Sequence, residues 1–324
     1  MSKWGIVLAN ADNAADLDRV DALGCTWYVA LHYQLADLVA LCRRRPGSRG
    51  VVRYFRRDLL SLPPETVALS VNLTWRQMQA AGLTDLIPGN EFNNQTEGRV
   101  YSPADAAARL RLLLAAIRTA CPGARLHLPA FSPPLDGASY YLACQDAGTF
   151  DLVDVVDVHA YGDSDDALAW VDLVTEIARE KPVAVTEYNF GAGRRVDPWW
   201  YAEDALRFFA GLERRPQVEA GAVFIWHWQD PDAELATTLD VRGQPIEQAI
   251  KDAVKQEVGM SLQTEYPQAY EEWVRAGGIE NNLRKHLLGI GILKPTAADL
   301  KLLASECESA VKQLEAAIAN FPFA

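Results

Sequence analysis

The sequence has few cysteines, and none of them is arranged in a recognisable pair. Five cysteines are scattered over 324 residues, and no Cys-x-x-Cys spacing occurs. An odd and scattered set argues against a disulfide framework and against a thiolate zinc site. No grouping of His, Asp and Glu has the spacing of a metal site either. We therefore expect reduced thiols, as in a cytoplasmic protein, and no metal or other cofactor.

The sequence also lacks a long hydrophobic run. No segment approaches the roughly 20 apolar residues that a membrane-spanning helix needs. The first residues, Met1 to Gly5, lead directly into a strand-like segment without the apolar region of a signal peptide. We expect a cytoplasmic protein that does not contact membranes. If its substrate is extracellular, a non-classical or phage-lysis route would have to export it.

Positive charge is in deficit. Lys and Arg total 31 against 43 Asp and Glu, a formal net charge of -12. Such a chain is a poor partner for nucleic acid or for anionic lipid, whose phosphates attract basic surfaces. No Gly-x-Gly-x-x-Gly or P-loop follows an early strand, which argues against a doubly wound open sheet. A neutral substrate fits the charge, although solubility alone accounts for it equally well.

Short apolar segments alternate with helical patterns over the first four-fifths of the chain. Several are almost continuously apolar, as expected of parallel strands covered on both faces. The strand candidates are Trp4–Ala9, Thr26–Leu31, Gly50–Phe55, Leu86–Asn90, Arg125–Ala130, Val153–His159, Val183–Glu187 and Ala222–Trp228. Eight such units in series predict a (β/α)8 barrel over residues 1–258. A doubly wound open sheet is the alternative.

Helix boundaries support this division. Ser102 followed by Pro103 is a typical start, and Asp165 or Ser164 is a candidate N-cap for another helix. The segment Thr66–Leu73 is rich in β-forming residues and fits either an extra strand or part of a helix. Residues 259–324 differ from the rest: they predict a small helical appendage with a long apolar stripe. That stripe would pack on the barrel or form a homodimer through the C-terminal helices; a targeting module is the other interpretation.

Two glutamates each close a buried strand candidate. Glu91 lies in Gly89-Asn90-Glu91-Phe92-Asn93, and Glu187 ends the seventh strand candidate. A carboxylate at such a position costs several kcal/mol to desolvate unless it is paired or hydrogen-bonded. In a barrel both would lie at the C-terminal ends of the strands, where active sites occur. A structural salt bridge is the alternative explanation for either glutamate alone.

This arrangement resembles the clan of retaining glycoside hydrolases on (β/α)8 barrels. In that clan the acid/base glutamate, preceded by asparagine, ends strand four, and the nucleophilic glutamate ends strand seven. The resemblance covers roughly residues 1–258, and Phe92 stands where proline is common. It implies that Glu91 is the acid/base and Glu187 the nucleophile. The acid must then hold a proton at neutral pH, so we expect burial and its anionic neighbour to raise the pKa of Glu91.

Further residues are candidates for substrate binding. The resemblance implies that Asn90 binds the substrate 2-hydroxyl, that Tyr161 donates to the nucleophile and that Trp226, with Trp228 on the same face, stacks on a sugar. His159 shares a strand face with Tyr161, because it lies two residues away. Arg53 could pair with Glu187. The alternatives are a loop-capping Asn90, core positions for His159 and Trp226, and a surface position for Arg53.

Together these features predict a retaining glycoside hydrolase that acts on a carbohydrate, expected to be a β-linked glycan. One alternative is a phage-type or autolytic peptidoglycan hydrolase on the same barrel. The other is a catalytically silent barrel that binds sugar or serves as a scaffold.

Overall fold

The computed structural model describes residues 3–8, 14–189, 197–226 and 241–254. The chain divides into two compact units, Met1–Glu257 and Val258–Ala324. The predicted C-terminal helical region, 259–324, lies outside the described residues, and so do Ala9 and Trp228. Among the described residues, no helix is both long and apolar enough to cross a bilayer.

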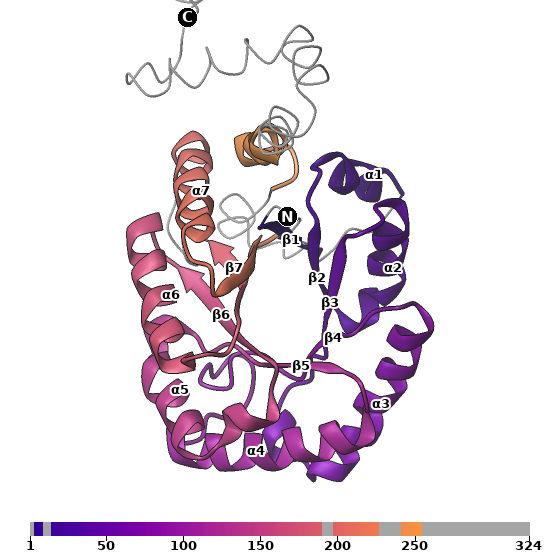
Figure 1. Cartoon of the computed structure of the whole chain (residues 1–324), viewed down its shortest axis with the longest axis vertical. Coiled ribbons are helices and arrows are strands. Elements are labelled where there is room, and N and C mark those ends of the chain that lie inside the picture. The colour runs from indigo at the N-terminus through magenta and orange to yellow at the C-terminus, as the bar shows by residue number, and fades with distance from the viewer. Residues whose placement is uncertain (1–2, 9–13, 190–196, 227–240, 255–324) are drawn as a thin grey trace, which may run out of the picture. The chain divides into compact units, whose positions relative to one another are not determined.

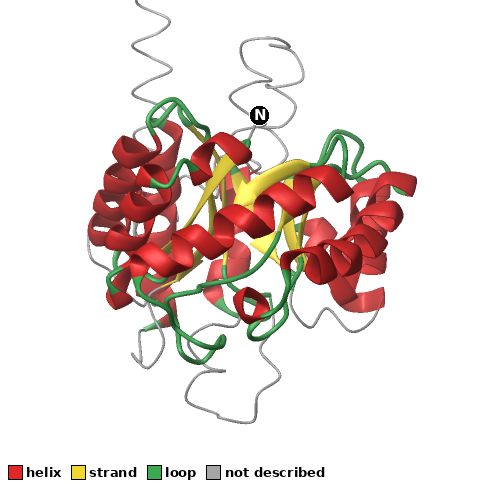
Figure 2. Cartoon of the chain, turned by 90° about the horizontal axis from the view of Figure 1, so that it is seen from below, coloured by secondary structure: helices red, strands yellow, loops and turns green. Residues whose placement is uncertain are grey.

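Eight parallel strands form a closed barrel in sequence order, which confirms the predicted (β/α)8 fold. Helices surround the strands, as Figure 1 and Figure 2 show. The strands are β1 (Trp4–Val7), β2 (Trp27–Leu31), β3 (Arg49–Arg53), β4 (Asp85–Ile87), β5 (Arg125–Leu128), β6 (Val155–Tyr161), β7 (Val183–Asn189) and β8 (Val218–Val223). The α-helices are α1 (Ala14–Ala22), α2 (Leu35–Arg44), α3 (Pro64–Ala80), α4 (Pro103–Ala120), α5 (Gly137–Asp146), α6 (Ser164–Ala178) and α7 (Pro198–Glu213), and residues 245–254 are also helical.

Three local predictions need correction or completion. The ambiguous segment Thr66–Leu73 belongs to α3. The N-cap of α6 is Asp163, whose carboxylate accepts from the backbone of Asp166, and not Ser164 or Asp165. Strand β8 begins four residues before the predicted Ala222 and ends at Val223. The sequence did not predict the first residues of β8, because Glu219 interrupts the apolar pattern. In the fold, Arg49 and Arg125 pair with the Glu219 carboxylate and so compensate its charge.

The barrel has an apolar shell outside and a partly ionic interior. Most buried apolar residues lie in one large cluster that joins the outer strand faces to the helices. A smaller apolar cluster, including Val29, Val51 and Ala184, alternates with those residues along the strands and fills the inner face. Toward the N-terminal ends of the strands, Asp85 and Glu219 lie among arginines from β3 and β5.

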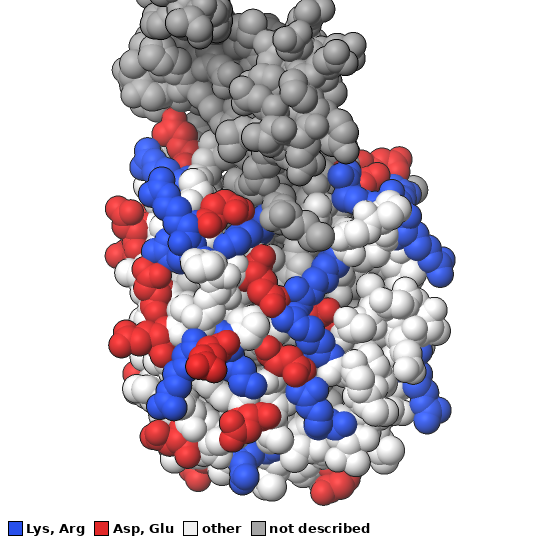
Figure 3. All heavy atoms as spheres, in the orientation of Figure 1, with Lys and Arg blue, Asp and Glu red and all other residues white. Residues whose placement is uncertain are grey.

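A buried histidine continues this ionic interior toward the middle of the barrel. His127 is fully buried, with Nδ1 2.6 Å from Oδ1 of Asp157 and Nε2 3.0 Å from Oδ1 of Asp85. Burial alone would lower the pKa of His127, but the two carboxylates outweigh burial and raise it to about 9. His127 is therefore a cation at neutral pH, and it compensates two buried carboxylates. The outer surface, in contrast, mixes acidic and basic side chains (Figure 3).

Candidate active site

The site lies at the C-terminal ends of strands β3, β4, β6 and β7. Arg53 is the last residue of β3, and His159 and Tyr161 lie near the end of β6. Glu187 lies near the end of β7, and Glu91 lies in the loop that follows β4. The structure thus brings together five of the seven residues singled out from the sequence. In most enzymes on this fold the reaction takes place at this end of the barrel.

A β-bulge turns Glu187 into the barrel. Along β7, Val183 and Val185 pack outward while Ala184 packs inward, so strict alternation would place Glu187 on the outer face. The pairing with β6 shifts, however, so that Val158 opposes Val185 and His159 opposes Glu187. The pairing of β7 with β8 shows the same extra residue on β7. Val185 opposes Gly221 and Tyr188 opposes Val223, so the segment of β7 between these pairs is one residue longer than that of β8. The bulge places Glu187 on the same face as His159.

The Glu187 carboxylate is held by one cation and one hydroxyl. Arg53 donates from Nη1 to Oε1, and the Tyr161 hydroxyl donates to Oε2. Arg53 and Glu187 are both buried, at 4% and 3% exposure. Burial and the charges of Glu187 and Glu91 raise the pKa of Tyr161 well above its usual value, so the hydroxyl stays a donor. An ion pair and a donor thus hold both oxygens of Glu187 in place, as suits a nucleophile.

Two loop asparagines and the backbone position Glu91. Its backbone N–H donates to Ala130 O over 3.0 Å, and its φ of 32° lies in the left-handed region. Next to it, the Asn93 side chain donates to Ser132 O and to Leu135 O, which ties this loop to the one after β5. The Glu91 carboxylate itself accepts from Asn94 Nδ2 over 2.7 Å. Asn94 was not singled out from the sequence; only its distance of three residues from Glu91, one turn along a loop, points to it.

His159 lies between the two glutamates. Its Nδ1 is 2.7 Å from Oε1 of Glu91, and its Nε2 is 3.5 Å from Oε1 of Glu187. Nη2 of Arg53 lies 3.1 Å from Nε2. A guanidinium only donates, so Nε2 accepts and the ring proton belongs on Nδ1, which donates to Glu91. His159 is thus part of the cluster and not merely a core residue.

The expected raised pKa of Glu91 is wrong for this arrangement. Burial does raise the pKa of the carboxyl, but hydrogen bonds from His159 and Asn94 and the charge of Arg53 outweigh it and lower the pKa below its usual value. Both carboxylate oxygens accept from donors, which favours the ionised form. Sequence patterns identify neither donor as a partner of Glu91, because both contacts come from the fold of the loop and of β6.

The two carboxylates come close together. One oxygen from each glutamate and one nitrogen of His159 all lie within 4.8 Å of one another. A cation could bind such a trio, but Arg53 already supplies positive charge there and contacts both His159 and Glu187. The arrangement is therefore suited to attack by one carboxylate and proton transfer by the other.

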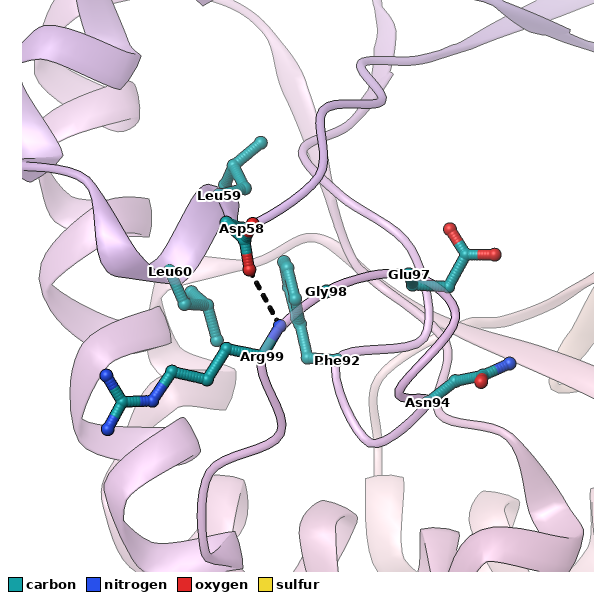
Figure 4. A pocket seen from close by; sticks show the side chains of 8 residues that line it. All are labelled: Asp58, Leu59, Leu60, Phe92, Asn94, Glu97, Gly98 and Arg99. Atoms are coloured by element: carbon teal, nitrogen blue, oxygen red, sulfur yellow. Dashed lines mark hydrogen bonds between the residues drawn. The ribbon is translucent and has the colours of Figure 1, made fainter.

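A small pocket lies beside Glu91 on the same loop (Figure 4). Its lining includes Phe92, Asn94 and Glu97, and Figure 4 shows the last two on one side of the phenyl ring. Burial and the charges of Glu91 and Glu187 raise the pKa of Glu97, even though a hydrogen bond from Asn90 lowers it. Glu97 is thus a third carboxyl within electrostatic reach of the pair, and the sequence analysis missed it.

The two remaining sequence candidates are Asn90 and Trp226. Oδ1 of Asn90 is buried and finds no partner among the described residues, so it can accept from a ligand. Trp226 follows β8 instead of ending it, is fully buried in the outer cluster and lies 5.6 Å from the Arg19 guanidinium. The ring of Trp226 is therefore buried in this structure, and its expected role as a sugar platform stays a prediction. The strand itself ends three residues before Trp226.

Comparisons with known proteins agree with this geometry. The family model described as glycosyl hydrolase catalytic core matches residues 66–244. A variant GH5_18 protein of Streptomyces cattleya, solved with Manβ1-4GlcNAc, has a TM-score of 0.64 at 19% identity and covers 79% of this chain and 81% of its own. A variant GH128 endo-β-1,3-glucanase of Amycolatopsis mediterranei, solved with laminaritriose and laminaribiose, has a TM-score of 0.53 at 17% identity over 77% of this chain and 98% of its own. A GH113 β-1,4-mannanase has a TM-score of 0.56 at 12% identity over 79% and 99%. No curated protein matches the chain.

Proposed function

The chain belongs to the glycosyl hydrolase catalytic core family, and we propose that it hydrolyses a β-linked glycan with retention of configuration. Membership in the family makes it a glycoside hydrolase on a (β/α)8 barrel. The substrate linkage and the stereochemistry are the proposed parts. Among the structural neighbours are a protein solved with Manβ1-4GlcNAc, an endo-β-1,3-glucanase and a β-1,4-mannanase, and this supports a β-linked substrate here.

The separation of the two carboxylates is the observation that carries the proposal. Retaining enzymes hold their two carboxyl groups about 5–5.5 Å apart, whereas inverting enzymes leave about 6.5–9.5 Å for a water molecule. One oxygen of Glu91 and one of Glu187 lie within 4.8 Å of each other, and this short separation supports retention. It leaves little room for a water between the carboxylates.

The contacts of Glu187 support its role as the nucleophile, and those of Glu91 fit the carboxylate form that acts in the second step. Glu187, bound by Arg53 and Tyr161, attacks the anomeric carbon while Glu91 gives its proton to the glycosidic oxygen. The carbon–oxygen bond breaks, and its electron pair stays on the leaving oxygen. In the second step the Glu91 carboxylate takes a proton from water, the water oxygen bonds to the anomeric carbon, and Glu187 leaves. His159 contacts Glu91 through Nδ1, which lies 2.7 Å from Oε1.

Variants of the two glutamates test the roles. Assays of the wild type on a panel of aryl β-glycosides come first, followed by NMR of the first-formed anomer. Glu187→Ala should abolish turnover, because no covalent intermediate forms. Glu91→Ala should lose on the order of 10²–10⁴-fold with poor leaving groups and far less with activated ones. Added azide should then restore Glu91→Ala and yield a β-glycosyl azide.

An exposed glutamate provides the control. Glu65→Ala, on the solvent side of α3, should keep wild-type rates. An inverted first product would refute retention. Near-wild-type activity in Glu187→Ala would refute the assignment of the nucleophile.

A further inference from the structure

The loop after β4 folds into two successive turns that stack Asn94 beside Glu91. The Asn94 backbone N–H donates to Glu91 O over 2.7 Å, and the Glu97 backbone N–H donates to Asn94 O over 3.0 Å. The Asn94 side chain returns to the carboxylate, where Nδ2 donates to Oε2 over 2.7 Å. Figure 4 shows this part of the loop with Asn94 and Glu97 side by side. One short loop therefore carries both the carboxyl and a donor to it.

Thr96 fixes the orientation of the Asn94 amide. Oδ1 of Asn94 accepts from the Thr96 backbone N–H over 3.1 Å and from the Thr96 hydroxyl over 2.9 Å. A backbone N–H can only donate, so the amide group cannot rotate by 180° to face Thr96 with its nitrogen. Nδ2 must therefore stay directed at Glu91. The donor is held in place before any substrate arrives.

Both oxygens of Glu91 consequently meet donors. Oε1 faces Nδ1–H of His159, and Oε2 faces Nδ2–H of Asn94. A proton on either oxygen finds no acceptor in these two neighbours, since a donor cannot accept it. When a glycosidic oxygen binds beside the carboxyl, that oxygen becomes the acceptor. Loss of the proton then strengthens both hydrogen bonds, because an ionised acceptor binds donors more strongly than a neutral one.

We propose that Asn94, held by Thr96, is a positioning residue that directs the proton of Glu91 to the leaving group and stabilises the carboxylate left behind. This inference rests on the proposed acid/base role of Glu91. In the step concerned, the proton moves from Glu91 to the glycosidic oxygen. The bond between that oxygen and the anomeric carbon breaks, and its electron pair stays on the oxygen. The Nδ2–H of Asn94 then hydrogen-bonds to the full negative charge on Glu91.

Several other titratable and charged groups also act on Glu91. They are His159 and Tyr161 on β6, Arg53 on β3, Glu187 on β7, Tyr141 on α5 and Glu97 on the same loop. A substitution at residue 94 replaces none of these side chains.

Asn94→Asp is the sharpest test, because an aspartate keeps an acceptor for Thr96 and replaces the donor by an anionic oxygen. Two effects are expected in kcat/KM. With poor leaving groups kcat/KM should fall on the order of 10- to 100-fold, because that factor corresponds to the loss of one hydrogen bond to a charged group. With activated aryl glycosides kcat/KM should fall only a few-fold. Its alkaline limb should move to higher pH, because a lost donor and a new negative charge raise the pKa of Glu91.

Two further variants complete the test. Thr96→Val removes the hydroxyl that donates one of the two hydrogen bonds to Oδ1 of Asn94. It should change kcat/KM and the pH profile in the same direction as Asn94→Asp, but by less. It also provides the test if Asn94→Asp fails to fold. Gln95→Glu adds a charge at the exposed neighbouring residue and should leave both readouts at wild-type values. If folded Asn94→Asp keeps the leaving-group dependence and the pH profile of the wild type, and Glu187→Ala is inactive, the positioning role of Asn94 is overturned. Activity in Glu187→Ala would instead overturn the proposed function.

Discussion

Nη2 of Arg53 donates to Nε2 of His159 across 3.1 Å, while the same guanidinium also binds Glu187. The Arg53 guanidinium thereby compensates the negative charge of Glu187, the proposed nucleophile. It also fixes the tautomer of His159, whose ring contacts Glu91, the proposed acid. Removing this cation should affect both glutamates at once.

Arg53→Met should therefore lower stability and activity together. Breaking a buried ion pair from one side leaves an uncompensated charge and costs about 3–5 kcal/mol. The measurement is the free energy of unfolding in urea, together with kcat on an aryl glycoside. Arg56→Met, at an exposed position just after β3, is the control and should change the free energy by less than about 0.5 kcal/mol. Equal stability of the two variants would show that Glu187 finds other compensation.

Tyr161→Phe should reduce kcat. The variant loses only the hydroxyl that donates to Oε2 of Glu187. A hydrogen bond to a charged group contributes about 1.5–3 kcal/mol, so kcat should fall by roughly 10-fold or more. Tyr33→Phe, at an exposed tyrosine, supplies the comparison. A kcat within two-fold of wild type would mean that the hydroxyl is dispensable.

His127 should make stability depend on pH in the mildly alkaline range. The pKa of His127 is raised to about 9 in the folded protein, above its unfolded value near 6.5, so the contribution is full below pH 6.5 and is lost as pH rises through 9. The whole effect is on the order of 3 kcal/mol. Urea unfolding at pH 6.5 and at pH 9.5 measures it.

The matched variant is His127→Gln, which should be less stable at pH 6.5 and should lose most of that pH dependence. If wild type and variant decline in parallel between the two pH values, another group is responsible.

Gly89 should tolerate no side chain. Its φ is 135°, and a Cβ there would lie 2.2 Å from the Phe92 ring, one residue beyond Glu91. Gly89→Ala should displace the loop, lower kcat and cost more than the ~1 kcal/mol expected from backbone strain alone. Gly82→Ala isolates that strain, because a Cβ there meets nothing within 4 Å. Melting curves and initial rates of both variants check this, and equal losses would exclude the steric contribution.

The fold followed from local patterns because the barrel repeats one simple unit. Buried runs such as Val183–Val185 are recognisable without knowledge of their neighbours. The predicted strand boundaries were wrong where the charge of an acidic residue is compensated by an arginine from another strand. Asp85 starts β4 and Glu219 lies inside β8, and each is paired by arginines that lie far away in the sequence.

The site was predictable only in part for the same reason. The positions of Glu91 and Glu187 followed from strand ends, and Arg53 pairs with Glu187 as the sequence suggested. The hydrogen bonds of Asn94 and the burial of Trp226 depend on loop geometry that no periodicity encodes. Alternation alone would even have turned Glu187 outward.

Because of the bulge in β7, the residue sequence of the strand does not by itself decide on which face of the barrel Glu187 lies. A β7 that kept Thr186 but paired without the bulge would direct Glu187 toward the helices, leaving Arg53 without its partner. The same sequence of site residues can thus give a complete or an incomplete site, depending on how one strand pairs with its neighbours. For barrels of this kind, strand pairing near the mouth is as informative as residue identity when active and silent relatives are compared.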